Sequence, residues 1–329
     1  MTHSRAPQYL CLCLLACLSL PLAASAQGYH FQRLWGSRGA GERQFHDPLG
    51  VALDPAGNVL VLDQDLNRVQ KFTPEGALLA TWGSEGAGPG QFDYPSGIAV
   101  DAAGHVFVAD QDNCRIQQLT AAGVFVAQWG AAGEGDGQFA YRKNLGGGLS
   151  GVAVDRAGHV YTTDSLLHRV QKFTSDGQFL AKWGTPGHAP GQFDGPHGIA
   201  VDAQGQVYVV DRFNSRIQKF SAAGEFLAQW GVKGLQPGQL VNPSGIALDA
   251  AGNVYVTDDN ALDFIEGNAN ALESRVVKFT ATGTFVAQWG QQGEDPGDLN
   301  VPTGIAVDAA GRVFVADTNN HRLVIFAPD

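Results

Sequence analysis

The sequence has few cysteines and, beyond its first segment, no long hydrophobic run. Three of its four cysteines lie within the first 26 residues, which leaves Cys114 as the single cysteine of the remaining chain. The first segment has a basic residue at Arg5, an apolar run over residues 10–22 and a small-x-small sequence at 24–26. These features are typical of a cleaved signal peptide. We therefore expect residues 1–26 to be removed and the protein to be periplasmic or secreted.

The scarcity of cysteine and of apolar runs excludes several classes of protein. A mature chain with Cys114 alone forms no internal disulfide and lacks the cysteine and histidine clusters of a structural zinc module. No later segment approaches the ~18 apolar residues of a membrane-spanning helix, so we expect no membrane span. An alternative is lipoprotein processing at Cys17, which lies inside the apolar run.

Basic residues are outnumbered by acidic ones. The chain has 21 Lys and Arg against 32 Asp and Glu, a formal net charge of −11. Loss of Arg5 with the leader makes the mature protein more acidic still. Because affinity for a phosphate backbone comes largely from Lys and Arg, we expect no nucleic-acid partner.

Tryptophan marks an internal repeat. All six tryptophans are followed by glycine, and their spacings are 47, 47, 54, 47 and 59 residues. A period in the forties is a signature of repeat architectures. The tryptophans are Trp35, Trp82, Trp129, Trp183, Trp230 and Trp289.

Each repeat predicts a four-stranded antiparallel sheet. Residues 97–129 contain four short runs rich in β-branched and aromatic residues, separated by turns that contain glycine. Six such sheets avoid long exposed edges by closing into a ring. The sixth repeat ends at Phe326 without a fourth strand, whereas residues 29–36 (YHFQRLWG) match the fourth-strand sequence of residues 224–231 (GEFLAQWG).

We therefore predict an all-β, six-bladed β-propeller of four-stranded antiparallel blades, closed by the N-terminal strand. Residues 27–329 should form this single domain, with residues 29–36 as the outer strand of the last blade. We expect a monomer.

The repeated motifs resemble the NHL repeat. The sequence reads PSGIAVD from Pro95, VYVVD from Val207 and NSRIQKF from Asn214. Propellers of this family include RNA-binding and ubiquitin-ligase modules, bacterial sensor ectodomains and the zinc lyase that completes peptide amidation. The resemblance implies the fold and does not choose among these functions.

Residues that recur in every repeat are interpreted as scaffold. An aspartate ends the second strand and an arginine begins the third, and we expect each pair to fix the loop between them by a bidentate contact. The six tryptophans should fill the gaps between blades. The paired residues are Asp63 and Arg68, Asp110 and Arg115, Asp164 and Arg169, Asp211 and Arg216, Asp258 and Arg275, and Asp317 and Arg322.

His197 departs from this recurrence. The corresponding positions in the other repeats are Leu49, Ser96, Ser150, Ser244 and Thr303. The resemblance to the amidating lyase implies zinc held by histidines from several blades at this kind of position, and only His197 matches. A catalytic zinc normally takes about three protein ligands. We therefore assign no metal, cofactor or catalytic residue, and we expect His197 to be a hydrogen-bonding group that gains charge between about pH 5 and 8.

Two insertions interrupt the repeats. The third repeat is longer within residues 139–151, and the fifth is longer between Asp258 and Arg275. Both loops should emerge on one face, on either side of the fourth repeat, and variable loops on a rigid scaffold are typical of binding sites. We predict a protein-, peptide- or glycan-binding face, with a metal-dependent hydrolase or lyase at the channel mouth as the alternative. The predicted binding residues are Tyr141, Arg142, His197, Arg212, Phe213, Asp263 and Phe264.

Overall fold

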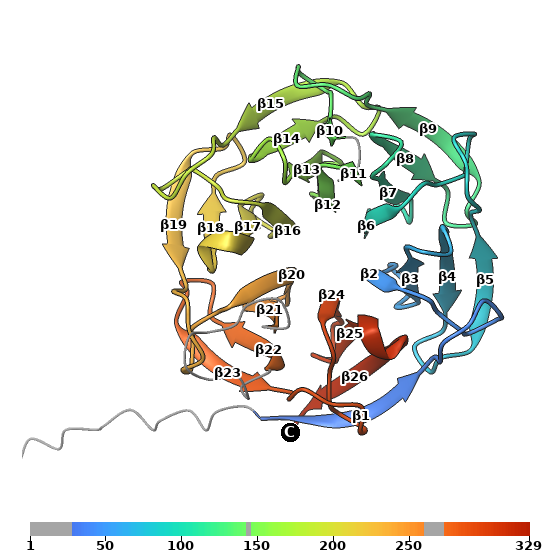
Figure 1. Ribbon diagram of the computed structural model, residues 1–329, viewed down its shortest axis with the longest axis vertical. Coiled ribbons are helices and arrows are strands. Elements are labelled where there is room, and N and C mark those ends of the chain that lie inside the picture. Colours follow the sequence, from blue (N-terminus) through green and yellow to red (C-terminus); the bar gives the residue numbers. More distant parts are fainter. Residues whose placement is uncertain (1–27, 143–145, 260–272) are drawn as a thin grey trace, which may run out of the picture.

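Six four-stranded antiparallel sheets surround a central channel in the computed structural model (Figure 1). The structure describes residues 28–142, 146–259 and 273–329. The sequence prediction of a six-bladed propeller is therefore confirmed. The predicted signal peptide, residues 1–26, lies outside the described residues. Within the described part of the chain, no helix is long and apolar enough to cross a membrane.

The strands follow one another from the channel outward, with blade one beginning at the first strand after β1. The innermost strands are β2 (Pro48–Leu53), β6 (Pro95–Val100), β12 (Leu149–Val154), β16 (Pro196–Val201), β20 (Asn242–Leu248) and β24 (Pro302–Val307). The second strands are β3 (Val59–Asp63), β7 (Val106–Asp110), β13 (Val160–Asp164), β17 (Val207–Asp211), β21 (Val254–Asp259) and β25 (Val313–Asp317). The third strands are β4 (Arg68–Phe72), β8 (Arg115–Leu119), β14 (Arg169–Phe173), β18 (Arg216–Phe220), β22 (Ser274–Phe279) and β26 (Arg322–Pro328). The outermost strands are β5 (Leu78–Trp82), β9 (Phe125–Trp129), β15 (Phe179–Trp183), β19 (Phe226–Trp230), β23 (Phe285–Trp289) and β1 (Tyr29–Trp35).

Burial changes with position in the blade. Every residue of β7 is buried, because neighbouring blades cover both faces of the second strand, whereas β9 alternates between half-buried and exposed residues. The turn between β6 and β7 is held by Asp101, whose carboxylate accepts hydrogen bonds from the backbone N–H groups of Ala103 and His105. This aspartate therefore acts in turn formation.

The N-terminal strand closes the ring. β1 pairs with β26 in antiparallel register, from Tyr29 opposite Pro328 to Trp35 opposite Leu323, with an irregularity between Phe31 and Arg33. Figure 1 shows β1 on the outside of β26, beside the C-terminus. The last blade thus combines the two ends of the chain, as the sequence match predicted.

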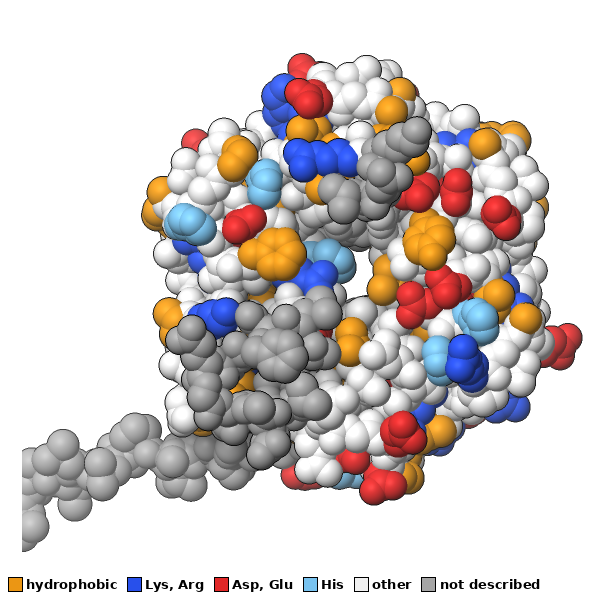
Figure 2. Space-filling view, in the orientation of Figure 1, with side chains coloured by type: hydrophobic (Ala, Val, Ile, Leu, Met, Phe, Trp, Pro, Cys, Tyr) orange, Lys and Arg blue, Asp and Glu red, His pale blue; other side chains and the backbone are white. Residues whose placement is uncertain are grey.

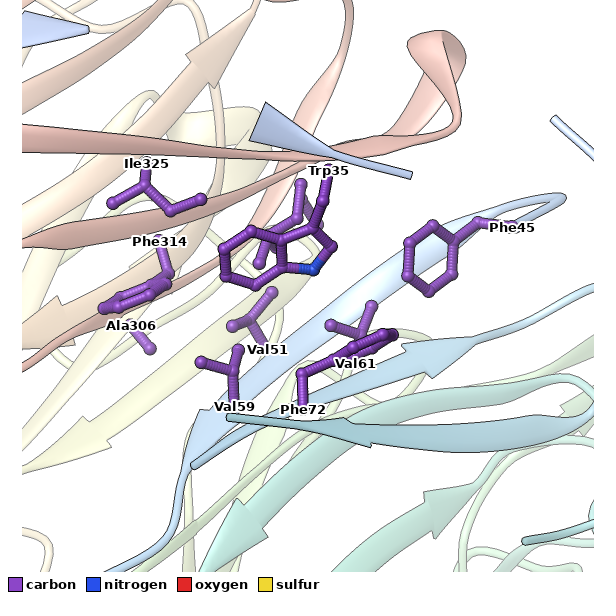
Figure 3. Close-up of a cluster of buried hydrophobic side chains, with 11 residues drawn as sticks. Trp35, Phe45, Val51, Val59, Val61, Phe72, Ala306, Phe314 and Ile325 are labelled. Atoms are coloured by element: carbon purple, nitrogen blue, oxygen red, sulfur yellow. The ribbon is translucent and has the colours of Figure 1, made fainter. Parts of the chain in front are cut away.

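Each tryptophan fills a space between its own blade and the next. Trp35 is 4% exposed and packs with Phe45, Val59 and Phe72 of blade one (Figure 3). A Cβ atom at Gly76, in the outer turn of blade one, would lie 2.9 Å from the Trp35 ring. Any residue larger than glycine at position 76 would therefore clash with the indole. The predicted packing role of the tryptophans is confirmed.

The recurrent aspartate and arginine fix the loop that leads into each blade. In blade four, Arg216 Nε lies 2.6 Å from Asp211 Oδ2, and the guanidinium also donates to the carbonyls of His188, Ala189 and Gln192. The pair is thus made through Nε rather than by the bidentate contact expected, because the terminal nitrogens of Arg216 bind backbone carbonyls. Nitrogen–oxygen contacts of 4.0 Å or less join the pair in all six blades.

Candidate functional site

The innermost strands line the central channel with glycine, serine and threonine, with branched apolar side chains and with His197. The channel cavity has a volume of about 80 Å³ and is lined by all six innermost strands. At one mouth it meets a larger cavity of about 400 Å³, lined by Leu49, Gln64, Tyr94, Ser96, Gln111, Asp112 and His197. His197 lines both cavities, so it stands where the channel opens.

His197 is a neutral imidazole at this mouth. Its Nδ1 lies 3.3 Å from the carbonyl oxygen of Ser244 in the next blade. Nδ1 also lies 3.5 Å from the Ser244 hydroxyl oxygen. The shorter contact is with a carbonyl, which only accepts hydrogen bonds, so we assign the proton to Nδ1 and the lone pair to Nε2. Burial, with the positive charge of Arg212, lowers the pKa of His197 to about 4. The expectation that this residue gains charge between pH 5 and 8 is therefore wrong, because the surrounding protein disfavours the imidazolium.

Arg212 and Phe213 lie beside His197, and with it they make the wall of the mouth that blade four contributes. They belong to the short 3-10 helix η1 (Arg212–Asn214), which follows β17. Arg212 Nε donates to Asn242 Oδ1 of blade five at 2.7 Å, and its guanidinium lies 5.8 Å from the Phe213 ring. Phe213 is 65% exposed, and its ring lies over Gly195, where a Cβ atom would come within 2.6 Å of it. The absence of a side chain at Gly195 therefore leaves room for the exposed ring of Phe213.

Burial lowers the pKa of Arg212, and the negative charge of Asp259 acts in the opposite direction. Arginine remains protonated across the physiological range. This wall therefore presents one fixed positive charge beside an exposed aromatic ring.

The facing wall is aromatic and acidic. Tyr94, which is 47% exposed, lies before β6, and the negative charge of Asp65 raises the pKa of its hydroxyl. Asp112 borders the same cavity. Burial, together with Asp65 and Asp63, raises the pKa of Asp47 to about 6. Figure 2 shows basic and histidine side chains at one edge of the central opening and acidic side chains around a hydrophobic one at the other.

The insertion of the third repeat contacts blade two. It forms a small hairpin of β10 (Tyr141–Arg142) and β11 (Gly146–Gly147), and the Gly147 N–H donates to Asp112 Oδ1 at 3.0 Å. Both residues of β10 are exposed. No hydrogen bond, ion pair or ring contact between described residues joins them to Arg212 or His197.

The seven predicted binding residues thus fall into three groups. His197, Arg212 and Phe213 lie together at the channel mouth, as the charge interaction and the ring contact between them indicate. Tyr141 and Arg142 lie on the hairpin beside blade two. Asp263 and Phe264 lie outside the described residues.

The residues that were not predicted include Tyr94 and Asp112, which line the mouth cavity, and Asn242, which binds Arg212. The sequence contains a signal for Tyr94 and Asn242. Each precedes the proline at the start of an innermost strand, and the residue at this position differs in every repeat that has the proline. That position holds Asp47, Tyr94, Gly195, Asn242 and Val301. Variation at one place in an otherwise regular repeat marks side chains that the scaffold does not require.

Metal-binding and reactive groups are sparse in the described part of the chain. No group of three or more histidine, cysteine, aspartate or glutamate side chains is arranged there to hold a metal ion. Cys114 is buried, and burial raises the pKa of its thiol to about 11. It is therefore a packing residue rather than a nucleophile at neutral pH.

Comparison with known proteins finds the same repeat and the same fold. The model of the NHL repeat matches residues 92–119, 193–220 and 299–326. A segment of 74 residues is 36% identical to NHL repeat-containing protein 3 of Mus musculus, over 22% of this chain and 21% of that protein. The match thus spans about a fifth of the curated relative's length.

Solved structures resemble the whole propeller. A streptogramin B lyase superposes with a TM-score of 0.60 at 14% identity, covering 92% of this chain and 98% of the lyase. A gluconolactonase from Xanthomonas campestris superposes with a TM-score of 0.57 at 16% identity, covering 87% of each chain. At such identities the likeness shows the fold alone.

Proposed function

Because the chain carries NHL repeats in a six-bladed propeller, we propose that it is a binding protein that holds a protein, peptide or glycan at the channel mouth. One observation carries the proposal: Tyr94 and Asp112 line a cavity of about 400 Å³ together with His197, and His197 lies beside Arg212. Arg212 and Phe213 contact each other on the side of His197, and Tyr94 and Asp112 lie on the other side of the cavity.

The chemistry of these walls supports ligand binding. Binding cavities combine aromatic surface with a few oriented polar groups, and loops held by a rigid scaffold commonly provide both. Phe213 and Tyr94 are among the exposed large hydrophobic side chains of the described residues. Neither is needed by the scaffold, because other repeats have different residues at both positions.

The test replaces the blade-four wall with the sequence of blades one and two. Arg212 and Phe213 become Gln and Asp, as in Gln64-Asp65 and Gln111-Asp112. Labelled wild type and variant are applied to peptide and glycan arrays. We expect the wild type to bind members of at least one array and the double variant to lose that binding with little change in melting temperature, since Asp211 and Arg216 still hold the loop.

The matched control is Ala222→Ser, on the face opposite the mouth. This variant should bind like the wild type. Equal array binding by the wild type and the Gln-Asp variant would contradict the proposal, as would a loss caused by Ala222→Ser alone.

A second candidate is a hydrolase or lyase reaction at the same mouth. The neutral imidazole of His197 favours it, because a free ring nitrogen at neutral pH suits a metal ligand. Elemental analysis of the purified protein separates the candidates. The binding proposal expects no stoichiometric zinc and no effect of His197→Ala on metal content, whereas zinc that is lost in this variant would favour the enzyme.

We also propose that the protein acts outside the cytoplasm, on the strength of the apolar run at 10–22 and the small residues at 24–26. Mass spectrometry of the protein from its native host should find an N-terminus near residue 27. An intact residue 1 in the mature protein would contradict export by cleavage, and a lipid on Cys17 would favour the lipoprotein alternative.

A further inference from the structure

A buried amide nitrogen next to Arg212 lacks a hydrogen-bond acceptor. Asn242 Oδ1 accepts from Arg212 Nε at 2.7 Å. Since Nε–H only donates, the amide atom facing it must be oxygen, and the other amide atom is the donor Nδ2. Asn242 is 6% exposed, and its Nδ2 has no hydrogen-bond partner. A buried donor without an acceptor is costly, so this position favours an acceptor brought by a ligand.

Arg212 offers further donors beside this amide. Its Nε bond to Asn242 and its contact with the Phe213 ring hold the guanidinium in place. No hydrogen bond or ion pair among described residues uses its two terminal nitrogens. By contrast, the terminal nitrogens of Arg216, in the same blade, bind three backbone carbonyls. A guanidinium fork matches the two oxygens of a carboxylate.

His197 adds an acceptor near these donors. Its Nδ1–H is directed to the Ser244 carbonyl, which leaves the Nε2 lone pair for a donor from a ligand. The end of a peptide has this pattern, because the N–H of its last residue stands beside the terminal carboxylate. The exposed rings of Phe213 and Tyr94 offer apolar surface for the last side chain.

The facing wall argues against highly charged anions. Asp112 borders the cavity, Asp65 lies close enough to raise the pKa of Tyr94, and the whole chain has a net charge of −11. Polyphosphates, nucleic acids and sulfated glycans would place several negative charges near these carboxylates. A ligand with one localised carboxylate meets less of that repulsion, although the charge of Asp259 also acts on Arg212.

We propose that the mouth recognises the free C-terminal carboxylate of a peptide. Arg212 and Asn242 donate hydrogen bonds to the carboxylate, and His197 Nε2 accepts one from the N–H of the last residue. This mode of recognition depends on the carboxylate itself rather than on the sequence before it. The inference rests on the proposed binding function and names its ligand class.

The test compares each peptide with its own amide. The probes are N-acetylated tripeptides that end in Phe, Tyr, Leu or Ala, each made as the free acid and as the C-terminal amide. Titration calorimetry with the mature full-length protein measures Kd at pH 7.5. We expect at least one acid to bind, and the acid to bind at least tenfold more tightly than its amide.

Three variants locate the effect. Arg212→Gln should reduce the preference for the acid to less than threefold, and Arg212→Lys should weaken it less, because it keeps the charge and loses the fork. Asn242→Asp should also remove the preference, since a carboxylate replaces the donor with only a small change in shape. Arg156→Gln removes an exposed arginine beside the cavity on the opposite face and should leave the preference intact.

The outcomes separate this inference from the proposed function. If acids and amides bind equally and the Gln-Asp variant still abolishes their binding, the carboxylate inference is wrong and the binding function stands. If no tripeptide binds but an array ligand binds through the mouth, the inference is again overturned alone. If the Gln-Asp variant has no effect on any ligand, both fail.

Discussion

Tyr29, the first residue of β1, stacks on Trp289, the last residue of β23, with ring centroids 4.0 Å apart and an interplanar angle of 12°. The hydroxyl of Tyr29 also lies 2.9 Å from that of Tyr255 in blade five. The N-terminal strand therefore contacts blade five through side chains while it pairs with β26 through its backbone. Closure of the ring depends on both sets of contacts.

Deletion of residues 29–36 should lower the melting temperature by more than about 10 °C and promote aggregation, because it exposes the edge of β26 and the cavity left by Trp35. Differential scanning calorimetry measures the effect. Tyr29→Phe is the control, since it keeps the stacked ring and loses only hydroxyl contacts, at a cost of about 1 kcal/mol. An unchanged melting temperature after the deletion would contradict closure by this strand.

Asp211→Ala should cost about 3–5 kcal/mol in the free energy of unfolding, because it leaves the buried guanidinium of Arg216 without its carboxylate. Urea denaturation measures the change. The matched control is Asp136→Ala, which removes an exposed ion pair with Lys182 at 2.6 Å and should cost about 0–1 kcal/mol. Similar costs for both variants would show that the recurrent pair does not hold the loop.

Gly224→Ala should destabilise the protein more than Gly191→Ala. Both glycines have a left-handed backbone, with φ of +87° and +81°. A Cβ atom at Gly224 would lie 2.7 Å from the Trp183 ring, whereas one at Gly191 would have no heavy atom within 4 Å. Conformational strain should cost about 1–2 kcal/mol at either site, and crowding of the indole about 1–3 kcal/mol more at Gly224. Equal costs would contradict the packing role of the tryptophan.

The pH dependence of stability should include a contribution from His197. Its pKa is about 4 in the folded protein, against 6.5 for the unperturbed side chain. The unfolded state therefore binds more protons between these values, and the wild type loses stability as the pH falls from 6.5 towards 4. Thermal melts of His197→Asn should show a gain of about 2 kcal/mol relative to the wild type between pH 7 and pH 4. A constant difference across this range would mean that the folded imidazole titrates normally.

Asp47→Asn should show the opposite trend. The pKa of Asp47 is about 6 when folded, above the ordinary value of 3.8, so the folded state binds more protons between these values. This residue therefore removes stability as the pH rises from 3.8 to 6. Relative to the wild type, the variant should gain about 1 kcal/mol between pH 4 and pH 8, since the partly exposed side chain is screened by solvent. The same melts measure it, and a gain confined to low pH would contradict the assigned direction.

The repeat itself determines the architecture. Six Trp-Gly pairs at regular spacing, strand-forming runs between glycine turns and the match of residues 29–36 to a missing fourth strand specify a closed propeller. These signals are local or periodic, so they can be read along the chain. The sequence also singled out His197, Arg212 and Phe213, because they interrupt a regular pattern.

Only the tertiary structure brought the mouth together. Asn242 accepts a hydrogen bond from Arg212 in the preceding blade, and Tyr94 of blade two lines the cavity at the mouth. The low pKa of His197 likewise depends on burial and on the charge of Arg212. Contacts across a ring join residues that are far apart in the chain. Desolvation and Coulomb interactions depend on those spatial distances, which the order of residues along the chain does not contain.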